Sequence, residues 1–176
     1  MEKVILVDEK DKAVGEMEKI EAHHKALLHR AVSIFVFNTM GEMLIQKRAL
    51  FKYHSPGLWT NTACTHPRMG EKNVDAAIRR ANEEMGLELN FAEEIFDFIY
   101  KAKLDDEMAE YELDHVFILY SDEIPQINKD EVSDYMYINT KRLLIEIQNS
   151  PKQFTVWFKK IVERVIKHVE QHNMAM

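Results

Sequence analysis

Runs of apolar residues divide the chain into predicted strands. "KVILVD" at 3–8 is a short apolar run, and we expect the next segment, "EKDKAVGE" at 9–16, to be the turn after it. "AVSIFVFN" at 31–38 is rich in β-branched and aromatic residues and predicts a buried strand. A turn, "TMGE", leads to "MLIQKRA" at 43–49, the predicted hairpin partner. Similar patterns predict three more strands, at 94–103, 111–120 and 132–138.

Two segments instead follow the helical period. "NVDAAIRRANEEMGLEL" begins at Asn73, a suitable N-cap, and has Gly86 where the residue after a helix is often glycine. Farther along, "NSPKQFTVWFKKIVERVIKHVEQH" predicts an amphipathic helix, with Ser150 as its cap and Pro151 in its first turn. Its apolar positions recur at helical spacing: Phe154, Trp157, Phe158, Ile161, Val162, Val165, Ile166 and Val169.

The elements together predict a layered fold. Strands interspersed with two or three helices are typical of α/β or α+β layers around a mixed sheet. No repeat, low-complexity tract or Ser/Gly-rich linker divides the chain, so we expect a single domain over 1–176.

Composition and charge exclude several classes of function. The net charge of -7 argues against non-specific nucleic-acid binding, and the longest apolar runs are too short to span a bilayer. The first ten residues, "MEKVILVDEK", carry charges throughout and do not resemble a secretory signal. One cysteine allows no intramolecular disulfide and suits a reducing compartment. We therefore expect a cytoplasmic monomer without nucleic-acid or membrane partners.

Extended segments bring some reactive residues onto common faces. "SPGLWTNTACTH" starts with a Pro-Gly turn and continues as an extended segment. Side chains alternate with period two in such a segment, so Cys64 and His66 should point the same way. Glu110 and Glu112 should likewise share one face of the strand that contains "AEYELDHVF".

The charged and imidazole side chains offer candidate metal ligands. "EAHHKALLHRA" contains His23, His24 and His29, and "NEEMG" puts Glu83 and Glu84 in the last turn of a helix, where acids oppose the helix dipole. Imidazoles and carboxylates are ligands for divalent metals. Each cluster alone has another interpretation, because surface histidines and solvated acidic pairs are common and a lone cysteine is usually a small buried hydrophobe.

Four motifs together resemble one enzyme family. "LLHRAVSIFVFN", "SPGLWTNTACTHP", "AAIRRANEEMG" and "EYELDHVF" are similar, in this order, to the type 1 isopentenyl-diphosphate isomerases. The resemblance implies a Nudix α/β/α sandwich with a mixed sheet. It also implies an enzyme of isoprenoid biosynthesis that interconverts isopentenyl diphosphate and dimethylallyl diphosphate, with a small diphosphate as its only expected partner.

The predicted helix also resembles the wider Nudix signature, with two departures. Thr65 stands where the signature begins with glycine, and Arg80 replaces the glutamate after the arginine. These departures weaken the alternative of a Nudix diphosphate hydrolase, in which that glutamate belongs to the metal-binding helix. A non-catalytic metal- or ligand-binding module is the second alternative. The matching positions are Glu71, Arg79, Glu83, Glu84 and Gly86.

The resemblance also implies metal and substrate ligands. Glu84 would help to hold Mg²⁺ on the substrate diphosphate, and Arg48, Lys52 and Arg80 would contact that diphosphate. A second divalent ion, Mn²⁺, Zn²⁺ or Mg²⁺, would occupy a histidine-rich site; the alignment through "EAH" favours His23 over His24 there and leaves the choice open. The implied ligands of that site are His23, His29, His66, Glu110 and Glu112.

The chemistry of double-bond migration gives roles to four residues that the resemblance supplies. A proton must be added at one carbon and removed at another, and Cys64 and Glu112 are the candidates for this work. Tyr100 would add a hydroxyl near the carboxylate. A carbocation-like species must be kept from water, and the aromatic face of Trp157 would stabilise it. Core packing is the alternative for both aromatic residues.

Overall fold

A computed structural model describes residues 2–104 and 108–173, and in them the nine strands form one mixed sheet. The strands are β1 (Lys3–Val7), β2 (Ala13–Glu18), β3 (His29–Phe37), β4 (Glu42–Arg48), β5 (Trp59–Thr60), β6 (Ala63–Thr65), β7 (Glu93–Lys103), β8 (Ala109–Tyr120) and β9 (Val132–Asn139). The helices are α1 (Lys19–His24), α2 (Asn73–Met85), α3 (Thr140–Asn149) and α4 (Val156–Asn173), with a 3₁₀ turn, η1 (Pro151–Gln153), before α4.

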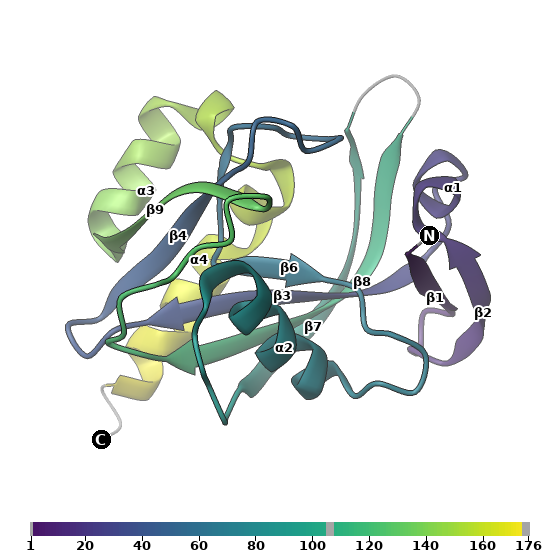
Figure 1. Cartoon of the computed structure of the whole chain (residues 1–176), viewed down its shortest axis with the longest axis horizontal. Helices are drawn as coiled ribbons and strands as arrows, with labels where there is room; N and C mark the ends of the chain where they lie inside the picture. Colours follow the sequence, from purple (N-terminus) through teal and green to yellow (C-terminus); the bar gives the residue numbers. More distant parts are fainter. Residues whose placement is uncertain (1, 105–107, 174–176) are drawn as a thin grey trace.

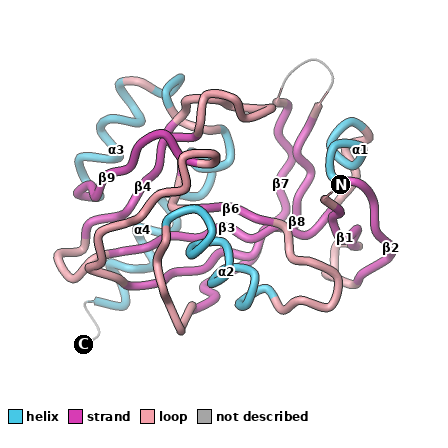
Figure 2. The backbone as a smooth tube through the Cα atoms, in the orientation of Figure 1, coloured by secondary structure: helices cyan, strands magenta, loops and turns pink. Residues whose placement is uncertain are grey.

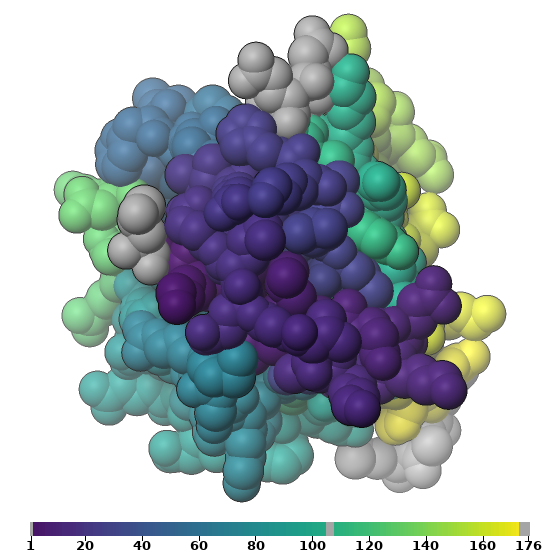
Figure 3. Space-filling view, turned by 90° about the vertical axis from the view of Figure 1, so that its right-hand side faces the viewer, coloured from purple at the N-terminus to yellow at the C-terminus, as the bar shows by residue number. Residues whose placement is uncertain are grey.

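Strand β3 is the centre of this sheet. Along one edge it pairs in succession with β1, β6 and β4, all antiparallel, and along the other it pairs in parallel with β8. β7 extends the sheet beyond β8, and β9 extends it beyond β4. Figure 1 shows β1, β2 and α1 at one end of the molecule and α3 with β9 at the other. The N-terminal segment crosses the end face that Figure 3 turns toward the viewer.

Helices cover both faces of the sheet (Figure 2). α4 packs on the face that carries Phe35 and Val116, and α2 packs on the face that carries Val32 and Phe117. The alternation along β3 explains both cores, because successive side chains point to opposite faces. The mixed sheet between helices confirms the predicted α/β/α sandwich, and all eight apolar positions expected along the last helix are buried.

The face that α4 covers changes from apolar to polar along the strands. Under α4 it carries the large side chains of Phe35 and Phe37, but toward the start of β3 the same alternation brings Ser33 and His29 to this face. β8 changes in the same way. A row of buried polar side chains therefore begins where the cover of α4 ends, and this row positions the site described below.

The amino-acid sequence did not predict β2, α1 or α3, because their local patterns are weak. The segment at 9–16 is not only a turn, since β2 starts at Ala13; its side chains are mostly exposed and show no apolar alternation. α3 was not predicted, because Leu143 is its single fully buried residue among those described. Among residues 2–104 and 108–173, no helix combines the length and the apolar composition that a membrane crossing needs.

The predicted helix ends also need correction. Asn73 is the first residue of α2, and Lys72 is its N-cap without a capping side chain. Pro151 lies in η1, and the side chain of Ser150 makes no capping bond there. The chain then turns extended at Phe154 before α4 begins. Gly86 does end α2, in the left-handed conformation.

Gly86 should be a sensitive position for stability. Its φ is +65°, and a Cβ atom would lie 2.6 Å from the backbone oxygen of Gln126. Gly41 has a φ of +75° but open space around it, so Gly41→Ala carries only the backbone cost of about 1–2 kcal/mol. Gly86→Ala should lower the free energy of unfolding by more than Gly41→Ala does, as measured by urea denaturation. Equal losses would show that the approach of Gln126 costs nothing.

Candidate active site

One pocket lies at the polar end of the sheet. Residues from α1, β3, β4, β6, α2, β7, β8 and α4 line it, together with the loop between β4 and β5. His29 is fully buried at the start of β3 and lies outside this lining. The sequence-predicted site residues that line the pocket are His23, Arg48, Lys52, Cys64, His66, Arg80, Glu84, Tyr100, Glu110, Glu112 and Trp157.

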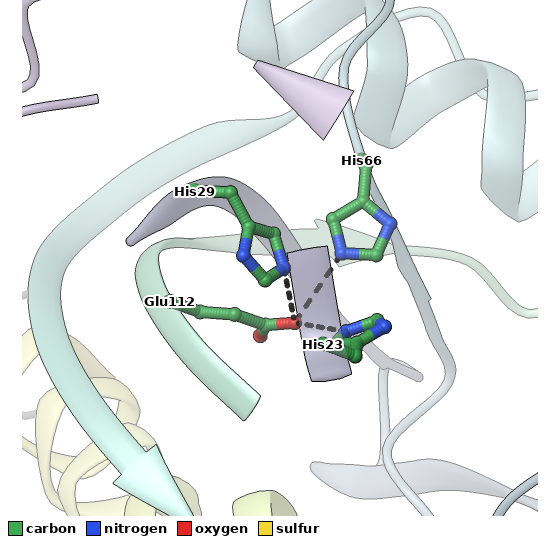
Figure 4. A group of neighbouring side chains, drawn as sticks. All are labelled: His23, His29, His66 and Glu112. Atoms are coloured by element: carbon green, nitrogen blue, oxygen red, sulfur yellow. Dashed lines mark hydrogen bonds and ion pairs between the residues drawn. The ribbon is translucent and has the colours of Figure 1, made fainter. Parts of the chain in front are cut away.

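Three imidazoles converge on one carboxylate oxygen (Figure 4). Oε1 of Glu112 lies 3.3 Å from Nε2 of His66, 3.4 Å from Nε2 of His29 and 3.9 Å from Nε2 of His23. One ligand atom from each of these four residues lies within 4.8 Å of the others. His24 is exposed on α1, so His23 is the neighbour that enters the group.

The hydrogen bonds around the group leave ring nitrogens available for a metal. Nδ1 of His29 lies 2.8 Å from the carbonyl of Leu27; a carbonyl only accepts, so Nδ1 carries the proton and Nε2 keeps its lone pair. Nε2 of His29 and both ring nitrogens of His23 are buried without a hydrogen-bond partner. Burial lowers the pKa of His23, which favours the neutral imidazole that metals bind. Three imidazoles and a carboxylate fit a divalent ion.

Tyr100 links the two glutamates of β8. Its hydroxyl lies 2.6 Å from Oε2 of Glu112 and 3.1 Å from Oε2 of Glu110. Burial and the neighbouring Glu112 carboxylate raise the pKa of Glu110 well above its usual range. Burial would also raise the pKa of Glu112, but the three neighbouring histidines hold it well below its usual range. Glu112 is therefore the ionised member, and Glu110 lies beside the four-residue group rather than in it.

The single thiol faces this pocket from β6. Cys64 is partly buried and lies opposite Ser33 on β3. Burial and the charge of Asp114 raise the pKa of Cys64, so the group is a thiol at neutral pH. It is therefore able to donate a proton.

The indole of Trp157 closes the side of the pocket beneath α4. The guanidinium of Arg48 lies 5.4 Å from the centre of the indole ring, so this aromatic face already binds a cation. The ring of His54 meets the indole edge-on, at 5.6 Å between centroids. Burial and the nearby Arg48 lower the pKa of His54 to about 3, so His54 is neutral.

The cations of the pocket are balanced by acids. Glu131 accepts from Lys52, and it lies 3.0 Å from Nη2 of Arg80. The same Nη2 lies 2.5 Å from Oε1 of Glu84, whose other oxygen accepts from Gln46. Burial raises the pKa of Glu84, which is almost fully enclosed. An anionic ligand at these cations would compete with the Glu131 carboxylate.

Sequence reasoning missed several residues of this pocket. Lys19 brings one more cation, held 2.9 Å from Oε2 of Glu2, whose other oxygen is 3.7 Å from Nδ1 of His66. His54 was also missed, as was Glu131, which pairs with two of the pocket's cations from outside its lining. The "KYH" that follows Phe51 was a usable signal for His54, because this histidine stands near an expected substrate lysine. Glu2 and Glu131 gave no such signal, because their partners are distant in sequence.

Comparisons with known proteins identify the family of the chain. The NUDIX domain family matches residues 27–158. The isopentenyl-diphosphate Delta-isomerase 2 of Photorhabdus laumondii is 51% identical over 159 residues, 90% of this chain and 89% of that protein. The isopentenyl-diphosphate Delta-isomerase of Pectobacterium atrosepticum is 46% identical over 162 residues, 92% of this chain and 90% of that protein.

Solved structures share the fold at lower identity. The protein DR0079 of Deinococcus radiodurans superposes with a TM-score of 0.76 at 22% identity, over 93% of this chain and 98% of that one. A MutT protein from Methanosarcina mazei gives a TM-score of 0.64 at 16% identity, over 78% of this chain and 91% of that one. Likeness at these identities supports the fold alone.

Neighbouring histidines of α1 provide a matched test of the metal group. His23→Ala removes one of four converging ligand atoms, so the purified protein should lose most of its tightly bound divalent metal. His24→Ala, one residue away on the exposed side, should keep the wild-type content. Elemental analysis after dialysis measures both. If His23→Ala retains its full metal content, the group of imidazoles has only a structural role.

Proposed function

The chain belongs to the Nudix family and, within it, to the isopentenyl-diphosphate Delta-isomerases, and on this premise we propose that Cys64 and Glu112 move the protons of the reaction. The enzyme interconverts isopentenyl diphosphate and dimethylallyl diphosphate. One observation carries the proposal: a thiol, a carboxylate and an aromatic face line the same pocket as three cations able to bind a diphosphate.

The resting protonation states suit a thiol–carboxylate pair. In the forward direction the thiol proton of Cys64 is added to the terminal carbon of the double bond, and the S–H electron pair stays on sulfur. A tertiary cation develops, and Glu112 takes a proton from the neighbouring methylene, whose C–H pair forms the new double bond. The turnover leaves a thiolate and a protonated carboxylate, and exchange with solvent resets both. Tyr100 orients Glu112 through its hydroxyl.

A metal ion bound at the histidines would act on the carboxylate of Glu112. A divalent ion held by His23, His29, His66 and Glu112 would supply a fixed positive charge that tunes the basicity of Glu112. Glu110 lies beside this group, joined to Glu112 through the hydroxyl of Tyr100, and is the fifth proposed ligand. The donor atoms suit Mn²⁺, Zn²⁺ or Mg²⁺, and Glu84 is the proposed contact to a Mg²⁺ ion that arrives with the substrate diphosphate. The unpaired thiol suits a reducing cytoplasm.

Substrate anchoring and water exclusion complete the proposal. Arg48, Lys52 and Arg80 would bind the diphosphate in place of the Glu131 carboxylate that now pairs with two of them. The hydrocarbon would then lie toward Trp157, which is 3% exposed and whose aromatic face stabilises a cation without attacking it.

A Nudix hydrolase is the competing function, and one contact argues against it. Arg80 stands where the hydrolase signature has a metal-binding glutamate, and its guanidinium pairs with Glu83 and Glu84. The helix therefore offers a metal fewer carboxylates than the hydrolase pattern requires. Release of phosphate, without isomerisation, from isopentenyl diphosphate would favour the hydrolase instead.

Activity in deuterated water tests the proposed pair. With isopentenyl diphosphate and Mg²⁺, wild-type protein should form the dimethylallyl isomer and introduce deuterium into product and recovered substrate, because each step exchanges a proton. Cys64→Ala should lose at least ~10²–10⁴-fold in turnover while remaining folded, and Cys64→Ser should also be severely impaired. Mass spectrometry follows the label. Near wild-type turnover by Cys64→Ala would return this residue to the core.

The aromatic wall is tested by a pair of substitutions at one position. Trp157→Phe should retain part of the rate, whereas Trp157→Leu, although apolar, should lose roughly tenfold more, because only an aromatic face stabilises a cation. Steady-state kinetics, with circular dichroism to confirm folding, measures the difference. Equal rates for the two variants would mean that packing alone explains Trp157.

A further inference from the structure

Behind Cys64, buried polar side chains form an unbroken chain of contacts from the start of α4 to β8. Apart from the thiol, which faces the pocket, each member is at most 2% exposed. The proposed reaction uses none of them directly except the thiol. In order of contact they are Thr155, Thr60, Asn61, Cys64, Ser33 and Asp114.

On the β8 side, this row of hydrogen-bonded side chains offers the sulfur an acceptor. The hydroxyl of Ser33 donates to Oδ2 of Asp114 at 2.7 Å. A serine hydroxyl has one proton, so toward Cys64, 3.7 Å away, Ser33 acts only as an acceptor. This contact is also the longest in the chain. A donor for the sulfur must therefore come from the other side.

Asn61 supplies that donor and an acceptor as well. Its Nδ2 lies 3.2 Å from Sγ of Cys64 and 3.2 Å from the carbonyl oxygen of Ile34, so these two acceptors share one N–H of the amide, and its Oδ1 lies 3.3 Å from the same sulfur. Two other contacts fix which end of the carboxamide is which: Nδ2 donates to the carbonyl of Ala63 at 2.7 Å, and Oδ1 accepts from the hydroxyl of Thr60 at 2.9 Å. A flipped amide would lose both bonds.

At the other end of the row, Thr60 and Thr155 connect the Asn61 amide to the start of α4. The hydroxyl of Thr60 donates to Asn61, so in its 2.9 Å contact with Thr155 it must accept. Thr155 lies two residues before Trp157. The same chain of bonds therefore holds the carboxamide beside the thiol and the residue that leads into the aromatic wall.

We propose that Asn61 is a positioning residue that hydrogen-bonds the sulfur of Cys64 in both of its protonation states. Oδ1 accepts the S–H of the thiol, and Nδ2 donates to the thiolate that remains after the proton has left. Both dipoles are in place before the transfer, so no side chain has to move when charge develops on sulfur. The inference rests on the proposed role of Cys64 and adds the residue that holds the sulfur of Cys64 in position beside the substrate.

The chain contains one cysteine, so its S–H stretching vibration reports on Cys64 alone. The infrared difference between wild type and Cys64→Ala should give one S–H band, shifted from the free-thiol position as expected for a donor bonded to a carbonyl. This measurement needs no turnover. A wild-type band at the free-thiol position would overturn the role of Asn61 even if isomerisation depends on Cys64.

Variants on the two sides of the sulfur separate Asn61 from its neighbours. Asn61→Ala should move the band to the free-thiol position and lower kcat roughly tenfold or more with little change in KM. Thr60→Val keeps the shape of residue 60, leaves Asn61 intact and removes the hydroxyl that orients the amide, so it should shift the band in the same direction. This variant tests the proposal even if Asn61→Ala does not fold. Ser33→Ala, the matched control, should leave the band in place. A band that moves in Ser33→Ala and not in Thr60→Val would assign the bond to Ser33 and overturn the proposal.

Discussion

The pairing register of β3 is the constraint on which the site depends. β3 pairs with β6 so that Ser33 lies opposite Cys64, and with β8 so that His29 lies opposite Glu112. Side chains alternate between the faces of a sheet, so a slip of one residue along β6 or β8 would turn the thiol or the carboxylate toward α2. Apolar residues farther along β3 and β8 oppose the slip between these two strands, because they would leave the core under α4. Packing at one end of β3 therefore positions the reactive side chains at the other end.

Burial of three acids in the pocket is tolerated because each of them has a nearby counterpart. The ionised Glu112 faces three imidazoles, Glu110 shares the hydroxyl of Tyr100, and Glu84 contacts Arg80. Removing one partner from such a pair leaves the other group buried and uncompensated, which costs more than the pair contributes. The arrangement also separates two sides: imidazoles surround the carboxylate at the start of β3, while cations gather near α2 and the loop after β4. That separation would orient an anionic substrate before it reaches the thiol.

The sequence predicted what depends on local pattern. β3, β4, β8 and α2 have dense apolar periods and were found nearly to their ends, whereas the exposed hairpin strand β2 and the helix α3 lack such periods. The pocket residues came from a family resemblance, since imidazoles from α1, β3 and the segment after β6 have no shared spacing. Ser33 and Asp114 left a signal that was not used: each is a polar residue on a buried face of its strand, next to apolar positions. Asn61 left none, because its contacts with Thr60, Ala63 and Cys64, although local, depend on the backbone conformation of this short segment.

Burial and the polar chain behind Cys64 have to occur together. A dry pocket keeps the thiol protonated and protects a developing cation from water, but it would also make a thiolate costly to form. A hydrogen-bond donor already directed at the sulfur offsets part of that cost without admitting water. In the described chain that donor is the amide of Asn61, fixed from one side by Thr60 and from the other by the backbone of Ala63. The pocket is thus apolar where the hydrocarbon would lie and polar directly behind the atom that loses its proton.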